Sequence, residues 1–88
     1  MKLKYTFIVN QVADKFVAVA VGAELAEFNG FIKMNDTGKE IFELLNEETT
    51  VDAVIAAMAE KHPEETVETV TEVVNGFVQK LQDEDVLA

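Results

Sequence analysis

Residues 31–60, FIKMNDTGKEIFELLNEETTVDAVIAAMAE, constrain the fold of this chain more than any other segment. A short apolar strand over residues 31–34 is expected to run into a helix, a polar turn and a second helix. Side-chain oxygens at residues 35–37 can all cap the first helix, and Thr37 with Glu40 has the spacing of a capping box. The segment therefore predicts a strand followed by two capped helices.

Helical periodicity supports the first two helices and predicts a third. The buried stripe of the first helix consists of Ile41, Leu44 and Leu45. The second, capped by Thr49 or Thr50, has apolar residues at i, i+3, i+4, i+7 and i+8: Val51, Val54, Ile55, Met58 and Ala59. The third is the longest, roughly Glu64 to Asp83, and Pro63 suits its first turn. Its apolar residues span about 140° at 100° per residue, which fits a well-buried helix or one that lines a groove at one edge.

The first part of the chain is expected to form a β-hairpin. β-branched and aromatic residues dominate residues 6–12 and 16–21, and Ala13-Asp14 can make the tight turn between them. Ala18 and Ala20 alternate with valines, so a neighbouring element is expected to pack closely against the alanine side. The hairpin, a third strand and three helices predict an α+β fold.

Three shorter features border these elements. Residues 23–30 are interpreted as a connection closed by Asn29-Gly30, a pair that readily adopts positive φ. Lys33, in the middle of the third strand, is typical of a sheet edge. Near the end of the chain, Val86-Leu87 is expected to form a terminal hydrophobic clasp.

The residue inventory excludes several kinds of chemistry. Eighty-eight residues predict one domain, residues 1–88, and the sequence contains no Cys, Ser, Arg or Trp. Disulfides, thiolate metal sites and Cys or Ser nucleophiles are therefore excluded. The one histidine, His62, is interpreted as an exposed loop imidazole. No catalytic residue, metal site or cofactor is expected, and the sequence gives no support for an enzyme.

Charge is divided unevenly along the chain. Residues 1–34 carry a net charge of +1 and residues 35–88 a net charge of −11, so nucleic acid is not an expected partner. Glu64, Glu68 and Glu72, at i, i+4 and i+8, would form an acidic ridge on the third helix. No apolar run approaches the roughly 20 residues that span a bilayer, so no membrane contact is expected. The N-terminus lacks the pattern of a signal peptide, which favours a cytoplasmic location.

The ordered motifs of the central segment resemble the PqqD-like family of leader-peptide recognition domains. In that family a strand ending in a hydrophobic residue and Asn leads through Glu/Asp-Thr-Gly/Ala into a helix with an aromatic residue and two leucines. A Thr-Val-acidic-x-aliphatic helix follows. The matching motifs are Met34-Asn35, Asp36-Thr37-Gly38, Ile41-Phe42-x-Leu44-Leu45 and Thr50-Val51-Asp52-x-Val54-Ile55. The resemblance runs from about Phe28 to Leu87, with Asp85 where family members commonly have Gly before the last aliphatic pair.

The resemblance implies a winged helix-turn-helix fold, with an N-terminal three-stranded antiparallel sheet followed by three helices. It also implies a function, which is to bind the leader segment of a ribosomally made precursor peptide by strand addition. The protein would present this peptide to a modifying enzyme, often a radical SAM protein. The peptide would lie between the third strand and the third helix, in contact with Gly30, Phe31, Ile32, Lys33, Met34, Val73, Val74, Phe77 and Leu81. A short edge strand beside a broad apolar helix face is physically suited to this mode.

Two other functions are left open by the sequence. A winged-helix transcriptional regulator would need basic residues on its recognition helix, whereas the third helix offers Lys80 against four acids in its first half. A general protein-interaction or dimerisation module without a peptide substrate is compatible with the same residues. The sequence identifies neither the precursor peptide nor the partner enzyme, the final product or the oligomeric state.

Overall fold

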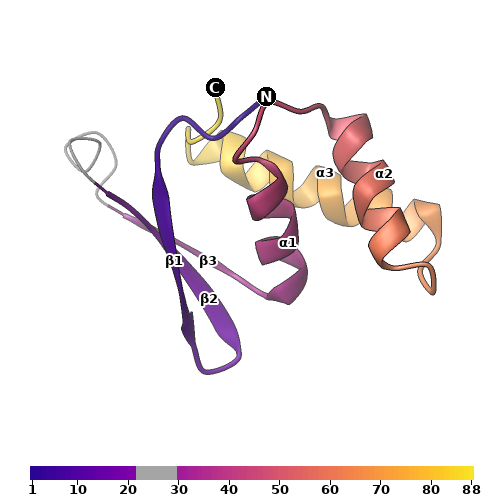
Figure 1. Ribbon diagram of the computed structural model, residues 1–88, viewed down its shortest axis with the longest axis horizontal. Coiled ribbons are helices and arrows are strands. Elements are labelled where there is room, and N and C mark those ends of the chain that lie inside the picture. Colours follow the sequence, from indigo (N-terminus) through magenta and orange to yellow (C-terminus); the bar gives the residue numbers. More distant parts are fainter. Residues whose placement is uncertain (22–29) are drawn as a thin grey trace.

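The computed structural model describes residues 1–21 and 30–88, and its elements follow the predicted order (Figure 1). They are β1 (Phe7–Val12), β2 (Lys15–Ala20), β3 (Phe31–Met34), α1 (Asp36–Leu44), α2 (Val51–Lys61) and α3 (Val67–Asp83). A three-stranded antiparallel sheet followed by three helices confirms the predicted α+β fold. Apart from Gly30, the connection expected over residues 23–30 lies outside the described residues.

The strands form one sheet in the order β1-β2-β3, so β1 and β3 are its edges. The hairpin turns at Ala13 and Asp14 as predicted, and Ala13 takes a positive φ of 57°. Ala18 and Ala20 are both 0% exposed, which confirms the close packing expected on the alanine side of β2. Because these side chains are small, α1 can lie directly against the strand.

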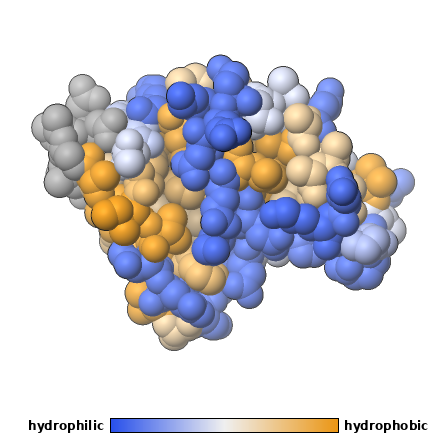
Figure 2. All heavy atoms as spheres, viewed as in Figure 1, coloured by the Kyte–Doolittle hydropathy of each residue, from blue (hydrophilic) through white to orange (hydrophobic). Residues whose placement is uncertain are grey.

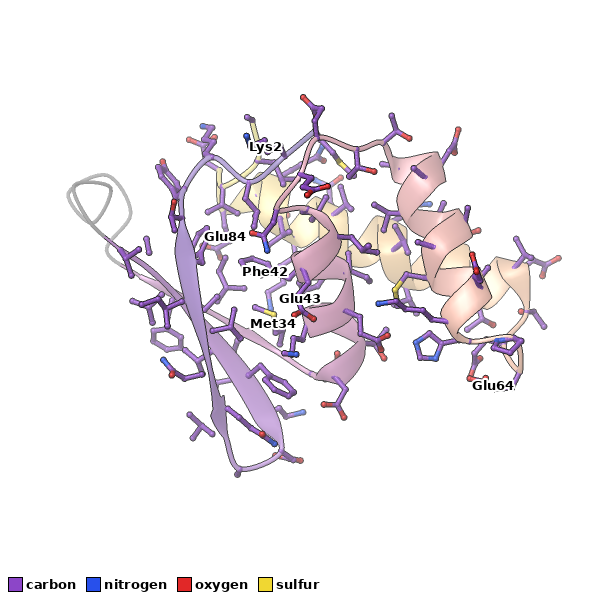
Figure 3. All side chains as sticks on the ribbon, in the orientation of Figure 1. Lys2, Met34, Phe42, Glu43, Glu64 and Glu84 are labelled. Carbon is purple, nitrogen blue, oxygen red and sulfur yellow. The ribbon has the colours of Figure 1, made fainter. Side chains whose placement is uncertain are left out.

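The core lies between the inner face of the sheet and the helices, and hydrophilic residues cover much of the face of the molecule that Figure 2 shows. Phe42 of α1 is 1% exposed and makes an edge-to-face contact with Phe7 of β1, with ring centroids 5.2 Å apart. In Figure 3, Phe42 and Met34 lie in the space between the strands and α1. Among the described residues, the other large side chains that are fully buried are Ile32, Ile41, Leu45, Met58, Leu81, Val54, Val74 and Val86. Every helix therefore contributes to one continuous core.

The cap of α1 is the first of the three residues that were expected to supply one. The side chain of Asn35 accepts a hydrogen bond from the backbone N–H of Gly38 at 2.8 Å, so Asn35 is the N-cap. The capping box expected for Thr37 and Glu40 is wrong, because α1 already begins at Asp36 and Thr37 lies inside it. Asparagine is a strong N-cap residue, and its earlier position starts the helix sooner.

The other two helices begin at threonine caps. Thr50 accepts a hydrogen bond from the backbone N–H three residues ahead at 3.1 Å, which confirms one of the two expected caps of α2. Thr66 caps α3 in the same way at 3.1 Å, so α3 begins at Val67 and not near Glu64. The prediction that Pro63 lies in the first turn of α3 is therefore wrong, since Pro63 precedes the helix. The expected acidic ridge is wrong for the same reason, because its first glutamate is outside α3.

The two ends of the chain lie side by side (Figure 1). Leu3 and Leu87 form an antiparallel bridge, and the Lys4 N–H donates to the Val86 carbonyl at 2.8 Å. Val86 is 0% exposed, which confirms the predicted hydrophobic clasp. Asp85, just before it, has a φ of 58° in the left-handed region that glycine adopts most readily. The position at which the resembled family commonly has Gly is thus one of positive φ in this chain.

Candidate functional site

The open edge of β3 is the first feature of the candidate site. Lys80 of α3 donates a hydrogen bond from its ammonium group to the backbone carbonyl of Lys33 at 2.7 Å. That carbonyl therefore points away from β2 and toward α3. Backbone groups of successive strand residues point to opposite edges, so Phe31 and Lys33 face outward, whereas Ile32 and Met34 face β2.

The side chains of β3 alternate between the core and solvent. Ile32 and Met34 are 2% and 4% exposed and belong to the core, whereas Phe31 is 60% exposed. Lys33 is also exposed, and Gly30 lies exposed just before the strand. Because the backbone groups of Phe31 and Lys33 face the open edge, an added strand would make its main-chain hydrogen bonds to these two residues.

A hollow of about 300 Å³ lies where α3 flanks the end of β3. It is lined by Lys15, Lys33, Met34, Asn35, Phe77 and Lys80. The hollow thus combines the start of β2, the end of β3, the cap of α1 and one side of α3. The predicted peptide contacts in this set are Lys33, Met34 and Phe77, whereas Lys15, Asn35 and Lys80 were not predicted.

Phe77, the aromatic wall of this hollow, is positioned by a glycine of α1. A Cβ atom added at Gly38 would lie 3.0 Å from Cε1 of Phe77 and 3.1 Å from Cβ of Met34. Both distances are shorter than ordinary van der Waals contact. The lack of a side chain at Gly38 therefore lets the half-buried Phe77 ring reach the first turn of α1.

The remaining predicted contacts on α3 lie elsewhere. Val73, 42% exposed, and Val74 line a second hollow of about 170 Å³, which also includes residues of α1 and α2. Val74 and Leu81 are 0% exposed, and with Ile32 their side chains form part of the core. Of the four α3 residues predicted to contact a peptide, Phe77 is the one that lines the hollow at β3.

His62 is not the exposed loop residue that was predicted. It caps the C-terminus of α2, and its side chain is 29% exposed. Its Nε2 lies 3.1 Å from Oε1 of Glu40 on α1, and its Nδ1 lies 3.4 Å from Oε2 of Glu64 (Figure 3). The imidazole therefore links α1 to the turn that precedes α3, which is a structural position on one side of the second hollow.

The hollow at β3 has the chemistry of a binding site. Three lysines, an asparagine, a methionine and a phenylalanine line it, and the ammonium group of Lys80 lies at its β3 side, on the carbonyl of Lys33. Over residues 1–21 and 30–88, no group of three or more His, Asp or Glu side chains is arranged to hold a metal ion. In the same two segments, no helix combines the length and apolar character needed to cross a membrane.

The family of the chain follows from a match that includes this site. Residues 13–87 match the family model described as coenzyme PQQ synthesis protein D (PqqD). The chain belongs to the PqqD family. The matched region begins in the hairpin turn and continues through β3, α3 and the terminal clasp, so it contains every residue that lines the hollow at β3.

A solved structure shares the fold of this PqqD-family chain. The chain described as "TbiB1 in Complex with the TbiA(beta) Leader Peptide" matches with a TM-score of 0.74 and 17% sequence identity. The match covers 99% of this chain and 94% of that chain, so the sheet and all three helices correspond. Among curated proteins, none matches this chain.

Proposed function

We propose that this PqqD-family protein binds the leader segment of a ribosomally made precursor peptide as an added strand on β3. The observation that carries the proposal is the outward-facing backbone of Phe31 and Lys33, with α3 beside it. The similar chain TbiB1, described in complex with a leader peptide, supports a leader peptide as the ligand. Main-chain pairing to an edge strand supplies affinity, and the adjacent hollow supplies sequence preference.

The short edge limits what strand pairing alone can contribute. Each hydrogen bond to Phe31 or Lys33 contributes about 0.5–1.5 kcal/mol net, whereas ordering one residue of a flexible peptide costs about 1–2 kcal/mol. Pairing therefore does not hold the leader without apolar contacts. Phe77, half-buried in the wall of the hollow, offers the aromatic surface for such a contact.

In this proposal the protein is a carrier and does not catalyse a reaction. A modifying enzyme of the radical SAM class would act on the peptide while its leader is held on β3. Strand addition suits this role because it fixes the leader and leaves the following segment free to enter an active site. Ribosomes release the precursor into the cytoplasm, so we place the encounter there.

An NMR titration tests the proposed edge. The probe is a peptide recovered from a display library of random short segments selected against the protein, which does not require the natural precursor. We expect the backbone amides of Phe31 and Lys33 and the ring of Phe77 to shift first. The amides of Val9 and Gln11, on the opposite edge of the sheet, should stay fixed. Shifts confined to α1 and α2 would refute the assignment.

A winged-helix transcriptional regulator is the main rival. Its recognition helix would be α3, whose one cation, Lys80, stands against three acids: Glu68, Glu72 and Asp83. A phosphate backbone would be repelled by this charge balance. The contact between Lys80 and the carbonyl of Lys33 also directs the cation toward β3 and not toward a groove of DNA.

A further inference from the structure

Three of the seven lysines of the chain line the hollow at β3. They are Lys15, Lys33 and Lys80, and none of the six lining residues is acidic. The chain as a whole has a net charge of −10. A cluster of one sign within a concave site raises the local concentration of ligands with the opposite charge. The hollow is therefore suited to a negatively charged group, although most of the chain is not.

Three of the four other lysines are already paired with carboxylates. These pairs are Lys4–Asp85 at 2.7 Å, Lys39–Glu43 at 3.3 Å and Lys61–Glu40 at 3.9 Å. Over residues 1–21 and 30–88, none of the three lysines of the hollow forms an ion pair. Lys80 instead donates to a neutral backbone carbonyl, that of Lys33. The hollow thus contains positive charge without a carboxylate partner.

We propose that the segment bound on β3 carries an acidic side chain, Asp or Glu, that pairs with Lys80 beside Lys15 and Lys33. This inference rests on the proposed function and adds the chemical class of the peptide. The bound peptide must then supply an apolar side chain that contacts Phe77 and a carboxylate close to that side chain. The two requirements lie close together because Phe77 and Lys80 are three residues apart on α3 and face the same side.

The position of Lys80 explains why the carboxylate matters. The Lys33 carbonyl that accepts from Lys80 is one that an incoming strand would use, because it faces the open edge. A peptide N–H that takes this carbonyl displaces the ammonium group. The freed ammonium then needs a new acceptor, and a carboxylate gives a stronger, charge-assisted hydrogen bond than the carbonyl it replaces. A neutral or basic segment would leave the freed ammonium group of Lys80 without an acceptor, in a hollow that two further lysines line.

Selection from a display library of random short peptides tests the acidic preference. Against the unaltered protein we expect Asp and Glu to be enriched at one fixed spacing from an apolar position. The double variant Lys33→Gln/Lys80→Gln should lose this enrichment. The matched control is Lys2→Gln/Lys61→Gln, which changes the net charge equally but away from the hollow, and it should retain the enrichment.

Affinity measurements with one selected peptide make the test quantitative. Replacing its acidic residue by the corresponding amide should weaken binding to the unaltered protein about fivefold, the upper range for a partly exposed ion pair. The same replacement should have no effect on binding to Lys33→Gln/Lys80→Gln. Binding of the acidic peptide should also weaken with added salt in the unaltered protein and much less in the double variant. Melting curves of every variant confirm that each is folded.

The outcomes separate this inference from the proposed function. Peptides that shift the amides of Phe31 and Lys33 but show no acidic preference, and bind equally well as amides, would overturn the inference and leave strand addition intact. Peptides that shift no resonance of β3 would overturn both. If acidic residues remain enriched with the double variant, groups other than Lys33 and Lys80 bind the carboxylate, which also contradicts the inference.

Discussion

The two edges of the sheet differ in length and in what lies beside them. β1 has six residues and β3 has four. The Val21 N–H donates to the Thr6 carbonyl at 3.0 Å, so Thr6 faces β2 and the alternation turns Val9 and Gln11 outward. Neither of the two hollows described above is lined by β1. The longer edge therefore has more backbone to offer, whereas the shorter one has a helix and a hollow next to it.

In the proposed binding mode, an open edge alone is not sufficient for a binding site. Unpaired strand edges are hazards for aggregation, and proteins protect them with charged side chains among other devices. On β3 the ammonium group of Lys80 is hydrogen-bonded to the outward carbonyl of Lys33. The side chain of Lys33 itself is exposed. In the proposed mode a competing donor removes this hydrogen bond, so β3 would be protected in the free protein and still open to a strand that brings a suitable partner for Lys80.

The largest expected effect separates the inward and outward positions of β3. Ile32→Pro removes a ladder hydrogen bond and a side chain that is 2% exposed, so we expect a loss of about 3 kcal/mol or more in unfolding free energy. Lys33→Pro removes an N–H that faces outward and is not part of the ladder. The preceding residue already has the extended backbone that proline requires of it. We therefore expect a loss below about 1 kcal/mol in unfolding free energy. Urea unfolding followed by circular dichroism measures both. Equal losses would show that the assignment of inward and outward residues is wrong.

Peptide affinity compares the two edges directly. Lys33→Pro should bind a selected peptide about fivefold more weakly than Lys33→Gln, because proline removes one backbone donor in addition to the charge. Gln11→Pro makes the same backbone change on β1 and should leave the affinity unchanged. Isothermal titration calorimetry on the three variants gives the comparison. If Gln11→Pro weakens binding as much as Lys33→Pro, the peptide pairs with β1.

The bounds of β3 were predictable from the sequence because they depend on neighbouring residues. Its bounds, residues 31–34, are confirmed, because an apolar run ending at a capping asparagine is a pattern of neighbouring residues. The contact between Lys80 and Lys33 joins residues 47 positions apart. It depends on how α3 is rotated against the sheet, which no short motif specifies. For the same reason the register that brings Lys15 to the end of β3 was not predictable.

The wide apolar face of α3 shows a second limit. The sequence predicted that Val74, Phe77 and Leu81 all face a peptide, but Val74 and Leu81 are 0% exposed. Periodicity gives the width of an apolar arc and not the part of it that other elements cover. Phe77 lies at the edge of the covered part. Lys80 follows it on the same side of the helix, and a search for a polar residue three or four positions from the aromatic would have indicated it.

Two glycines on neighbouring helices give the next comparison. At Gly38 a new Cβ would press on Phe77, and overpacking of about 1–3 kcal/mol outweighs the helix propensity of about 1 kcal/mol gained by alanine. We therefore expect Gly38→Ala to lower the unfolding free energy by about 1 kcal/mol and to weaken peptide binding. At Gly76 nothing lies within 4 Å, so Gly76→Ala should raise stability by about 0.5–1 kcal/mol.

Differential scanning calorimetry of both alanine variants, followed by peptide titration, tests this contrast. The binding loss should be limited to Gly38→Ala, because its methyl group displaces the ring that forms the wall of the hollow at β3. Equal stabilisation by the two substitutions would mean that Phe77 has room to move. Its position would then not depend on Gly38.

The smallest expected effect concerns nucleic acid. The three lysines of the hollow are a basic cluster in a chain of net charge −10. If all three contacted phosphates, binding would fall with salt at a slope of only about −3 on logarithmic axes, compared with the 6–10 contacts typical of strong DNA binders. The −11 charge of residues 35–88 opposes even this contact. Fluorescence anisotropy with a labelled duplex near physiological salt should therefore show no measurable binding, and Lys33→Gln/Lys80→Gln should behave identically. Sub-micromolar, salt-sensitive binding that the double variant abolishes would make the edge of β3 a nucleic-acid contact and favour the transcriptional regulator.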